Sequence, residues 1–118
     1  MNYVIITSYG EVNATEKAVS SILPQLPKNT KLIVSDPFPE TKWMLEEKFP
    51  NVEYFEGPDQ GKSKALNLLF KKLWSEDKNS ILILTDGDVY LGENAIKEIL
   101  KKFENSDVGC VSGRPMSL

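Results

Sequence analysis

Residues 81–88 carry the sequence ILILTDGD, and this stretch decides how the chain can fold. Its first four residues form the most apolar run of the chain, which predicts a central β-strand buried on both faces. The run stops at Thr85, and two carboxylates follow it, Asp86 and Asp88, with Gly87 between them. A strand of this kind belongs in a parallel sheet that is covered by helices.

Apolar runs and amphipathic segments alternate on both sides of this strand. The apolar runs predict further strands, and the helical spacing of apolar residues in the segments between them predicts helices. The first helix is expected to start at a capping box formed by Asn13 and Glu16 and to end near Pro24. The order predicts one α/β domain with an open, mostly parallel sheet flanked by helices. The expected strands are 3–7, 31–35, 52–56, 81–84 and 108–112, and the later helices are 41–49, 62–74 and about 93–103.

Composition narrows the chemistry that the chain can perform. It has 118 residues and a formal net charge of −3, which gives no reason to expect nucleic acid as a partner. The absence of histidine excludes His-based triads and histidine metal sites. The single cysteine, Cys110, excludes an internal disulfide and is expected in the core. No segment is long enough to span a bilayer, so we expect the chain to be soluble as written. The single cysteine fits a cytoplasmic setting, at the inner face of a membrane if the chain belongs to a longer protein.

Polar side chains gather where the predicted strands end. Ligands of open parallel sheets bind beyond the carboxyl ends of the strands, so residues at these positions are candidates for contact with a ligand. Such candidates follow the first, second and fourth predicted strands; they are Thr7, Tyr9, Asp36, Asp86 and Asp88.

Two basic residues join these candidates. Lys62 opens a helix directly after a glycine, where the helix dipole and the ammonium both favour a phosphate group. Arg114, close to the end of the chain, is a further candidate for binding an anion. Each candidate also has a structural alternative: Asp36 caps the turn at Pro37, Thr7 and Tyr9 pack at the strand end, and the lysine is solvated.

Asp86 and Asp88 are expected to form a metal site around a turn at Gly87. On an extended strand the two side chains would point to opposite faces, but glycine permits an unusual backbone angle that brings both round to one site. Two close carboxylates repel, and Mg²⁺ or Mn²⁺ relieves that repulsion, with phosphate oxygens and water completing its shell. The alternative is a polar turn that ends the strand.

Five segments in chain order resemble motifs of the family-2 glycosyltransferases of the GT-A fold. They are residues 7–9 (TSY), 20–25 (SSILPQ), 34–36 (VSD), 61–67 (GKSKALN) and 85–88 (TDGD). The resemblance covers nearly the whole chain. It implies a Rossmann-like GT-A nucleotide-binding core, truncated relative to such enzymes, that binds a UDP- or GDP-linked sugar. The implied reaction is attack of an acceptor hydroxyl on the anomeric carbon of that sugar.

The resemblance also implies roles for the matched residues. The segment with Thr7 and Tyr9 is similar to the first donor loop. Asp36 matches a nucleoside-binding acid, and Lys62 matches a base that contacts the donor. By the same likeness, Asp86 touches the ribose or the metal, and Asp88 coordinates Mn²⁺ or Mg²⁺ on the diphosphate.

The chain departs from the family pattern in three ways. Ser35 replaces the first acid of the usual V-D-D segment, and Pro37 and Pro39 replace the usual G-S turn. No later carboxylate is available as a catalytic base and no Q-x-x-R-W segment is present, so the catalytic residue is unknown. The acceptor half is therefore expected to be absent, and apolar surface left exposed by its absence favours self-association.

Three rival interpretations stay open. Residues 57–63, GPDQGKS, join a strand to a helix as a P-loop does, but they have one residue too few between the glycines, and Pro58 removes a backbone donor. A phosphatase that forms an aspartyl-phosphate uses a D-x-D segment, but normally after its first strand. A module that binds nucleotide without catalysis agrees with the missing base.

Overall fold

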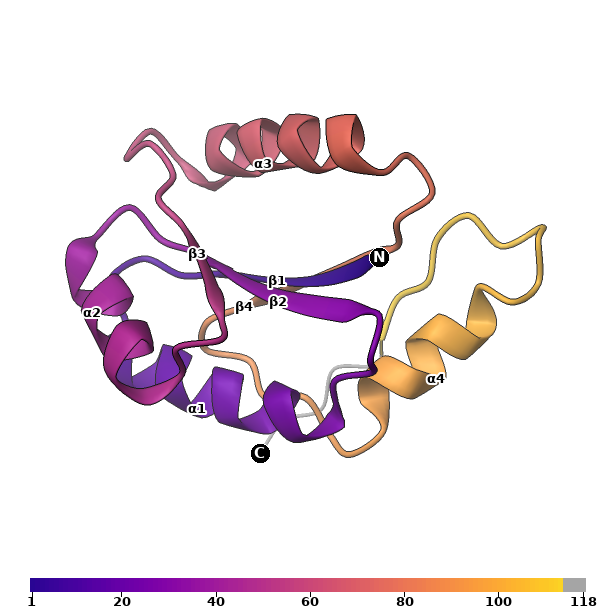
Figure 1. Ribbon diagram of the computed structural model, residues 1–118, viewed down its shortest axis with the longest axis horizontal. Helices are drawn as coiled ribbons and strands as arrows, with labels where there is room; N and C mark the ends of the chain where they lie inside the picture. The colour runs from indigo at the N-terminus through magenta and orange to yellow at the C-terminus, as the bar shows by residue number, and fades with distance from the viewer. Residues whose placement is uncertain (114–118) are drawn as a thin grey trace.

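The computed structural model describes residues 1–113, in which one parallel sheet is covered by helices (Figure 1). Its strand order is β3-β2-β1-β4, and each neighbouring pair is parallel. This confirms the α/β class. Arg114 lies outside the described residues. The strands are β1 (Asn2–Thr7), β2 (Thr30–Ser35), β3 (Glu53–Phe55) and β4 (Leu82–Asp86), and the helices are α1 (Val12–Ile22), η1 (Leu23–Gln25), α2 (Pro39–Lys48), α3 (Lys62–Glu76) and α4 (Ala95–Lys102).

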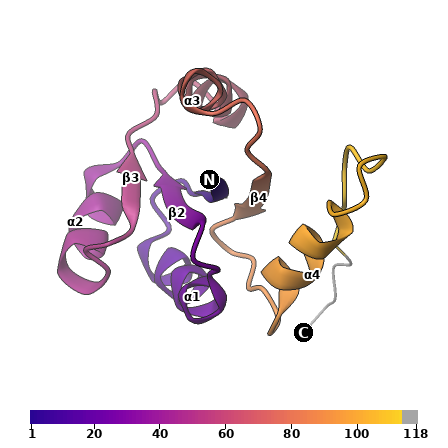
Figure 2. The same cartoon turned by 45° about the vertical axis from the view of Figure 1, so that its right-hand side comes forward.

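The helices lie in two layers on either side of the sheet (Figures 1 and 2). The face that carries Val4 and Ile6 packs against α1, α2 and α4. The opposite face, which carries Tyr3 and Ile5, packs against α3 through Leu69 and other apolar residues. Because alternate residues of a strand point to opposite faces, β1 buries side chains in both layers and forms the centre of the fold.

The apolar run of residues 81–84 predicted a central strand, and this prediction is wrong. Among the described strands, β4 pairs only with β1 and forms an edge of the sheet. Ile83 is buried in the larger layer, but the side chain of Leu84 is 50% exposed. An apolar run shows that a strand is partly buried, yet it does not show how many neighbours the strand has.

The predicted last strand is also wrong. Residues 108–112 adopt no regular secondary structure, and the amide of Val108 donates to the Asn105 carbonyl, closing a turn at 3.0 Å. Cys110 is exposed and does not belong to the core. An apolar segment forms a strand only when another strand offers it hydrogen-bonding partners, and within residues 1–113 none pairs with this one.

The first helix starts earlier than the expected capping box. Gly10 has a φ of 72° and turns the chain directly after β1, so α1 begins at Val12. Asn13 therefore lies inside the helix, and no side chain caps its first turn. Glu16 instead forms an ion pair with Lys48 of α2. None of the helices within residues 1–113 combines the length and apolar character that crossing a membrane requires.

Candidate functional site

Four residues form one row across the carboxyl edge of the sheet. Thr7 is the register partner of Ser35 on one side and of Asp86 on the other, and Ser35 is in turn the partner of Phe55. Register partners in a parallel sheet point to the same face. Here that face is the one that α3 covers, because Phe55 packs in the α3 layer. Three polar side chains therefore stand side by side at the end of the sheet nearest the start of α3.

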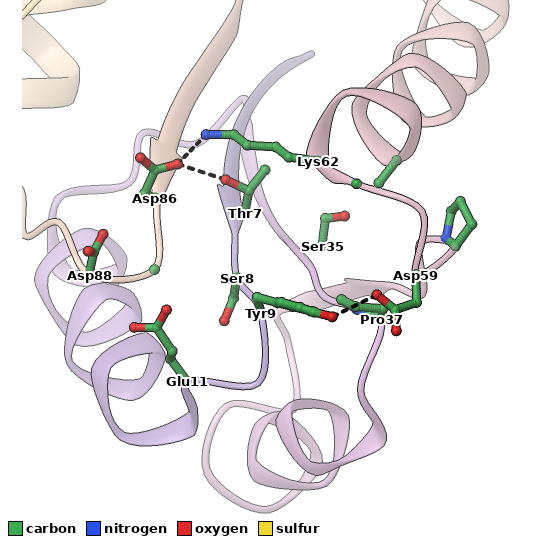
Figure 3. A pocket seen from close by; sticks show the side chains of 14 residues that line it. Thr7, Ser8, Tyr9, Glu11, Ser35, Pro37, Asp59, Lys62, Asp86 and Asp88 are labelled. Carbon is green, nitrogen blue, oxygen red and sulfur yellow. Dashed lines mark hydrogen bonds and ion pairs between the residues drawn. The ribbon is translucent and has the colours of Figure 1, made fainter.

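A cleft of about 350 Å³ opens beside this row (Figure 3). Four segments form its walls: the loop after β1, the end of β2, the loop that leads into α3, and the end of β4. Of the six predicted site residues that lie within residues 1–113, five line it: Thr7, Tyr9, Lys62, Asp86 and Asp88. Residues far apart in the sequence thus meet at one cleft.

Asp86 is held by two donors on its Oδ1 atom. The Lys62 ammonium lies 2.5 Å from this oxygen, and the Thr7 hydroxyl donates to it at 2.9 Å (Figure 3). The hydrogen bond from Lys62 lowers the pKa of the Asp86 carboxyl below its usual value, and the bond from Thr7 lowers it further by a smaller amount. Asp86 is therefore ionised at neutral pH and oriented before any ligand arrives.

Gly87 allows the turn after β4 for a reason other than the expected one. It does not have a positive φ, unlike Gly10 and Gly61. A Cβ atom placed on Gly87 would lie 2.9 Å from Thr15 Oγ1 and 3.2 Å from Ser8 Cβ. The position thus requires glycine because the turn packs closely against α1 and the loop after β1.

Asp88 lies on the other side of this turn. Figure 3 shows its side chain apart from the contacts that join Asp86 to Lys62 and Thr7. Within residues 1–113, no group of three or more acidic or cysteine residues is placed to hold a metal ion. Two carboxylates at one cleft nevertheless suit Mg²⁺ or Mn²⁺, because these ions commonly take one or two protein carboxylates and complete their shell with phosphate oxygens and water. Asp86 and Asp88 are therefore the two residues of the cleft that could hold such a cation.

Asp36 is the predicted site residue that does not line the cleft. It is fully buried, and its carboxylate contacts Thr41 of α2, a helix of the layer opposite to α3. Its carboxylate accepts hydrogen bonds from the amides of Gly10 (2.9 Å) and Phe38 (2.8 Å) and from the Thr41 hydroxyl (2.7 Å). The bond from Phe38 caps the turn at Pro37, as the structural alternative had it. A direct contact between Asp36 and a nucleoside stays a prediction.

Ser35 takes the place at the cleft that the sequence suggested for Asp36. It ends β2 and lines the cleft, one residue earlier in the chain. The alternation of side chains along a strand could have found it, because Thr7, Ser35 and Asp86 each end a strand on the α3 face. The sequence reasoning also missed Glu11 and Asp59, two acids that line the same cleft.

Tyr9 forms an aromatic wall at one end of the cleft. Its ring lies 4.8 Å from that of Phe38, and its hydroxyl donates to Asp59 at 2.9 Å. This hydrogen bond joins the loop after β1 to the loop before α3 and raises the pKa of the Tyr9 phenol. The ring is 55% exposed, so its surface is open to a planar ligand.

The beginning of α3 forms the wall opposite β4. Gly61 has a φ of 99°, a conformation that favours glycine, and Lys62 is the first residue of the helix. The first amides of a helix lack intrahelical partners and attract anions. The cleft thus brings the positive end of a helix and a lysine close to two carboxylates.

Comparison with known proteins agrees with this geometry. A family model described as glycosyl transferase family 2 matches residues 3–117. Among solved structures, the chain is similar to S. aureus TarS 1–349, with a TM-score of 0.60 and 17% sequence identity. That match covers 100% of this chain and 39% of the TarS chain, so this chain spans about two fifths of that structure. At this identity the likeness shows the fold. No curated protein matches the chain.

Proposed function

The chain belongs to glycosyl transferase family 2, and on this premise we propose that its cleft binds a nucleoside-diphosphate sugar, UDP- or GDP-linked, together with Mn²⁺ or Mg²⁺. The observation that carries the proposal is the row of Ser35, Thr7 and Asp86, which faces Lys62 at the start of α3. Such a row offers hydroxyl and carboxylate groups to a nucleoside and a cation, beside a positive helix end for phosphate.

The two ends of the cleft differ in the chemistry that they offer. At one end, Tyr9 presents an exposed ring and Ser35 a hydroxyl, which suit the flat face and polar edge of a base. At the other end, Lys62 and the first amides of α3 suit the diphosphate, and Asp86 with Asp88 suits the cation or the ribose. A bound divalent cation supplies positive charge that stabilises the leaving diphosphate.

Transfer of the sugar to an acceptor hydroxyl is the second part of the proposal. The family supports this reaction class. In this proposal, residues 1–118 serve as a single nucleotide-sugar-binding domain. The alternative is a module that binds nucleotide without turnover. Its support is that the three carboxylates in the matched motifs, Asp36, Asp86 and Asp88, all have other proposed roles, which leaves none of them as the base that activates an acceptor. A radiolabelled sugar nucleotide separates the two, because retained binding without hydrolysis or transfer identifies the module.

Calorimetry with UDP and GDP tests the proposed site directly. We expect binding of at least one nucleotide to be tighter with Mn²⁺ or Mg²⁺ than with chelator, since the cation links phosphate to the carboxylates. Asp88→Ala is expected to abolish this difference and to leave the fold intact, because the Asp88 side chain makes no hydrogen bond within residues 1–113. Asp107→Ala, which removes an exposed acid from another turn, is the control.

The outcomes of this experiment are distinct. Equal affinity with and without chelator would remove the cation from the proposal. Absence of binding by every nucleotide and cation combination would remove the nucleotide site itself. Unfolding of Asp88→Ala would instead favour a strand-ending role for this acid.

A further inference from the structure

The ion pair between Lys62 and Asp86 joins two parts of the cleft that are expected to serve different ligands. Lys62 begins α3, at the wall suited to phosphate, and Asp86 ends β4, at the wall suited to a cation. The two residues nevertheless bind each other at 2.5 Å (Figure 3). The ammonium therefore occupies a position at the carboxylate that a metal cation bound to Asp86 would also need.

This contact is suited to exchange. The side chains of Lys62 and Asp86 are 57% and 50% exposed, and an ion pair between exposed groups is only weakly favourable because water competes for both partners. Lysine has a long, flexible stem, so its ammonium can move without the helix moving. The Thr7 hydroxyl keeps its hydrogen bond to Asp86 Oδ1 and can hold the carboxylate in place if the lysine leaves.

The two cations compete for one carboxylate. An ammonium and a divalent cation on the same carboxylate repel each other, so Lys62 opposes the binding of a metal ion alone. A diphosphate in the cleft changes this balance, because it offers the ammonium a second anion beside the start of α3. The diphosphate thus draws the ammonium away from Asp86, which favours binding of the cation, and the cation displaces the ammonium, which is then free to contact the diphosphate.

We propose that Lys62 couples the two ligands: its ammonium holds Asp86 in the ligand-free cleft and moves to the diphosphate when nucleotide and cation bind. The inference rests on the proposed function. It gives Lys62 opposite effects on two ligands, since it weakens the binding of the cation alone and strengthens the binding of the nucleotide. By linkage, it also increases the factor by which each ligand tightens the other.

Lys62→Met in the 118-residue chain tests the coupling, because methionine keeps an unbranched side chain in the helix without the charge. Binding of Mn²⁺ without nucleotide is measured from the electron paramagnetic resonance signal of the free ion. Nucleotide binding is measured by calorimetry in two separate experiments, one with chelator and one with Mn²⁺. We expect the variant to bind Mn²⁺ alone several-fold more tightly and to bind nucleotide several-fold more weakly. The coupling factor between the two is expected to fall at least about fivefold.

Lys64→Met is the matched control. Lys64 lies two residues further along α3, bonds to Gln60 and does not line the cleft. The Lys64→Met substitution removes the same charge from nearly the same place, so any effect of net charge alone appears in both variants. Only the effect of the specific contact with Asp86 is confined to Lys62→Met.

The result that overturns the coupling is an affinity for Mn²⁺ alone that Lys62→Met leaves unchanged, lowers, or raises no more than Lys64→Met does. If the wild-type chain still binds nucleotide with Mn²⁺ in that case, the proposed function stands and only the coupling is wrong. If the wild-type chain binds no nucleotide under any condition, both fail together.

Discussion

Thr7 and Asp86 are register partners in neighbouring parallel strands, and the Thr7 hydroxyl donates a hydrogen bond of 2.9 Å to Asp86 Oδ1. The bond holds the carboxylate at the end of β4 through the same oxygen that Lys62 contacts. The amide of Gly87 reinforces the arrangement, because it donates to the Thr7 carbonyl at 2.8 Å. The orientation of the proposed cation ligand is thus set by the pairing of two strands.

Thr7→Val is expected to weaken nucleotide binding in the presence of Mn²⁺ while leaving the fold intact. Valine has nearly the shape of threonine but cannot donate, so Asp86 loses a hydrogen bond. A bond of this kind contributes about 1 kcal/mol, which corresponds to roughly a fivefold loss of affinity. Calorimetry measures the loss, and Thr85→Val in β4, next to Asp86, is the control, because the Thr85 hydroxyl makes no hydrogen bond within residues 1–113. Equal losses in both variants would show that the Thr7 bond has no specific role.

Asp36→Asn is expected to lower the free energy of unfolding by about 2–3 kcal/mol. The buried carboxylate accepts hydrogen bonds from two amides and a hydroxyl, and an amide side chain cannot accept all three. Chemical denaturation measures the change. Asp59→Asn, at an exposed acid, is expected to change stability by less than about 0.5 kcal/mol. A stable Asp36→Asn protein that has lost nucleotide affinity would instead support direct contact between Asp36 and the nucleoside.

The outcome for Asp36 shows where sequence reasoning succeeds and where it stops. The order of strands and helices was predictable, because apolar runs and helical spacing report local burial. The meeting of Thr7, Lys62 and Asp86 was predictable as well, because ligands bind at the carboxyl ends of parallel strands. Moving the predicted end of a strand by one residue places the last side chain on the other face of the sheet. A sequence pattern does not locate strand ends to within one residue, so it could not decide between Ser35 and Asp36.

Two other errors have the same origin in long-range structure. The edge position of β4 depends on which strands pair with it, and its apolar residues do not contain that information. The need for glycine at position 87 comes from its approach to Ser8 and Thr15, which are distant in the sequence. Local propensity describes one segment at a time, so neither property could be predicted from it.

Gly87→Ala is expected to destabilise the protein by about 1–3 kcal/mol, because the new methyl group would lie 2.9 Å from Thr15 Oγ1 and force the turn to shift. The shift would also move Asp88 and weaken nucleotide binding with Mn²⁺. Thermal unfolding and calorimetry measure the two effects. Gly92→Ala is the control, since a methyl group there has nothing within 4 Å and the residue has no positive φ. A Gly87→Ala protein as stable as Gly92→Ala would contradict the close packing of this turn.

Tyr54→Phe is expected to change how stability depends on alkaline pH. The Tyr54 hydroxyl donates to the Asp36 carbonyl at 2.5 Å and lies 3.1 Å from the Phe38 carbonyl, and burial, with the nearby Asp36 charge, raises its pKa to about 12. In the unfolded chain the phenol ionises near its ordinary pKa of 10.0. The folded state therefore disfavours ionisation, and the contribution of this residue is fully present below pH 10 and is lost as pH rises toward 12.

We expect Tyr54→Phe to lose about 1 kcal/mol near neutral pH, from the missing hydrogen bonds, and to show a shallower decline of stability between pH 10 and 12. Denaturation of both proteins across this range measures the difference, in which the ionisation of Tyr3 cancels because both proteins contain it. Parallel declines would show that Tyr54 does not hold the turn after β2 in this way.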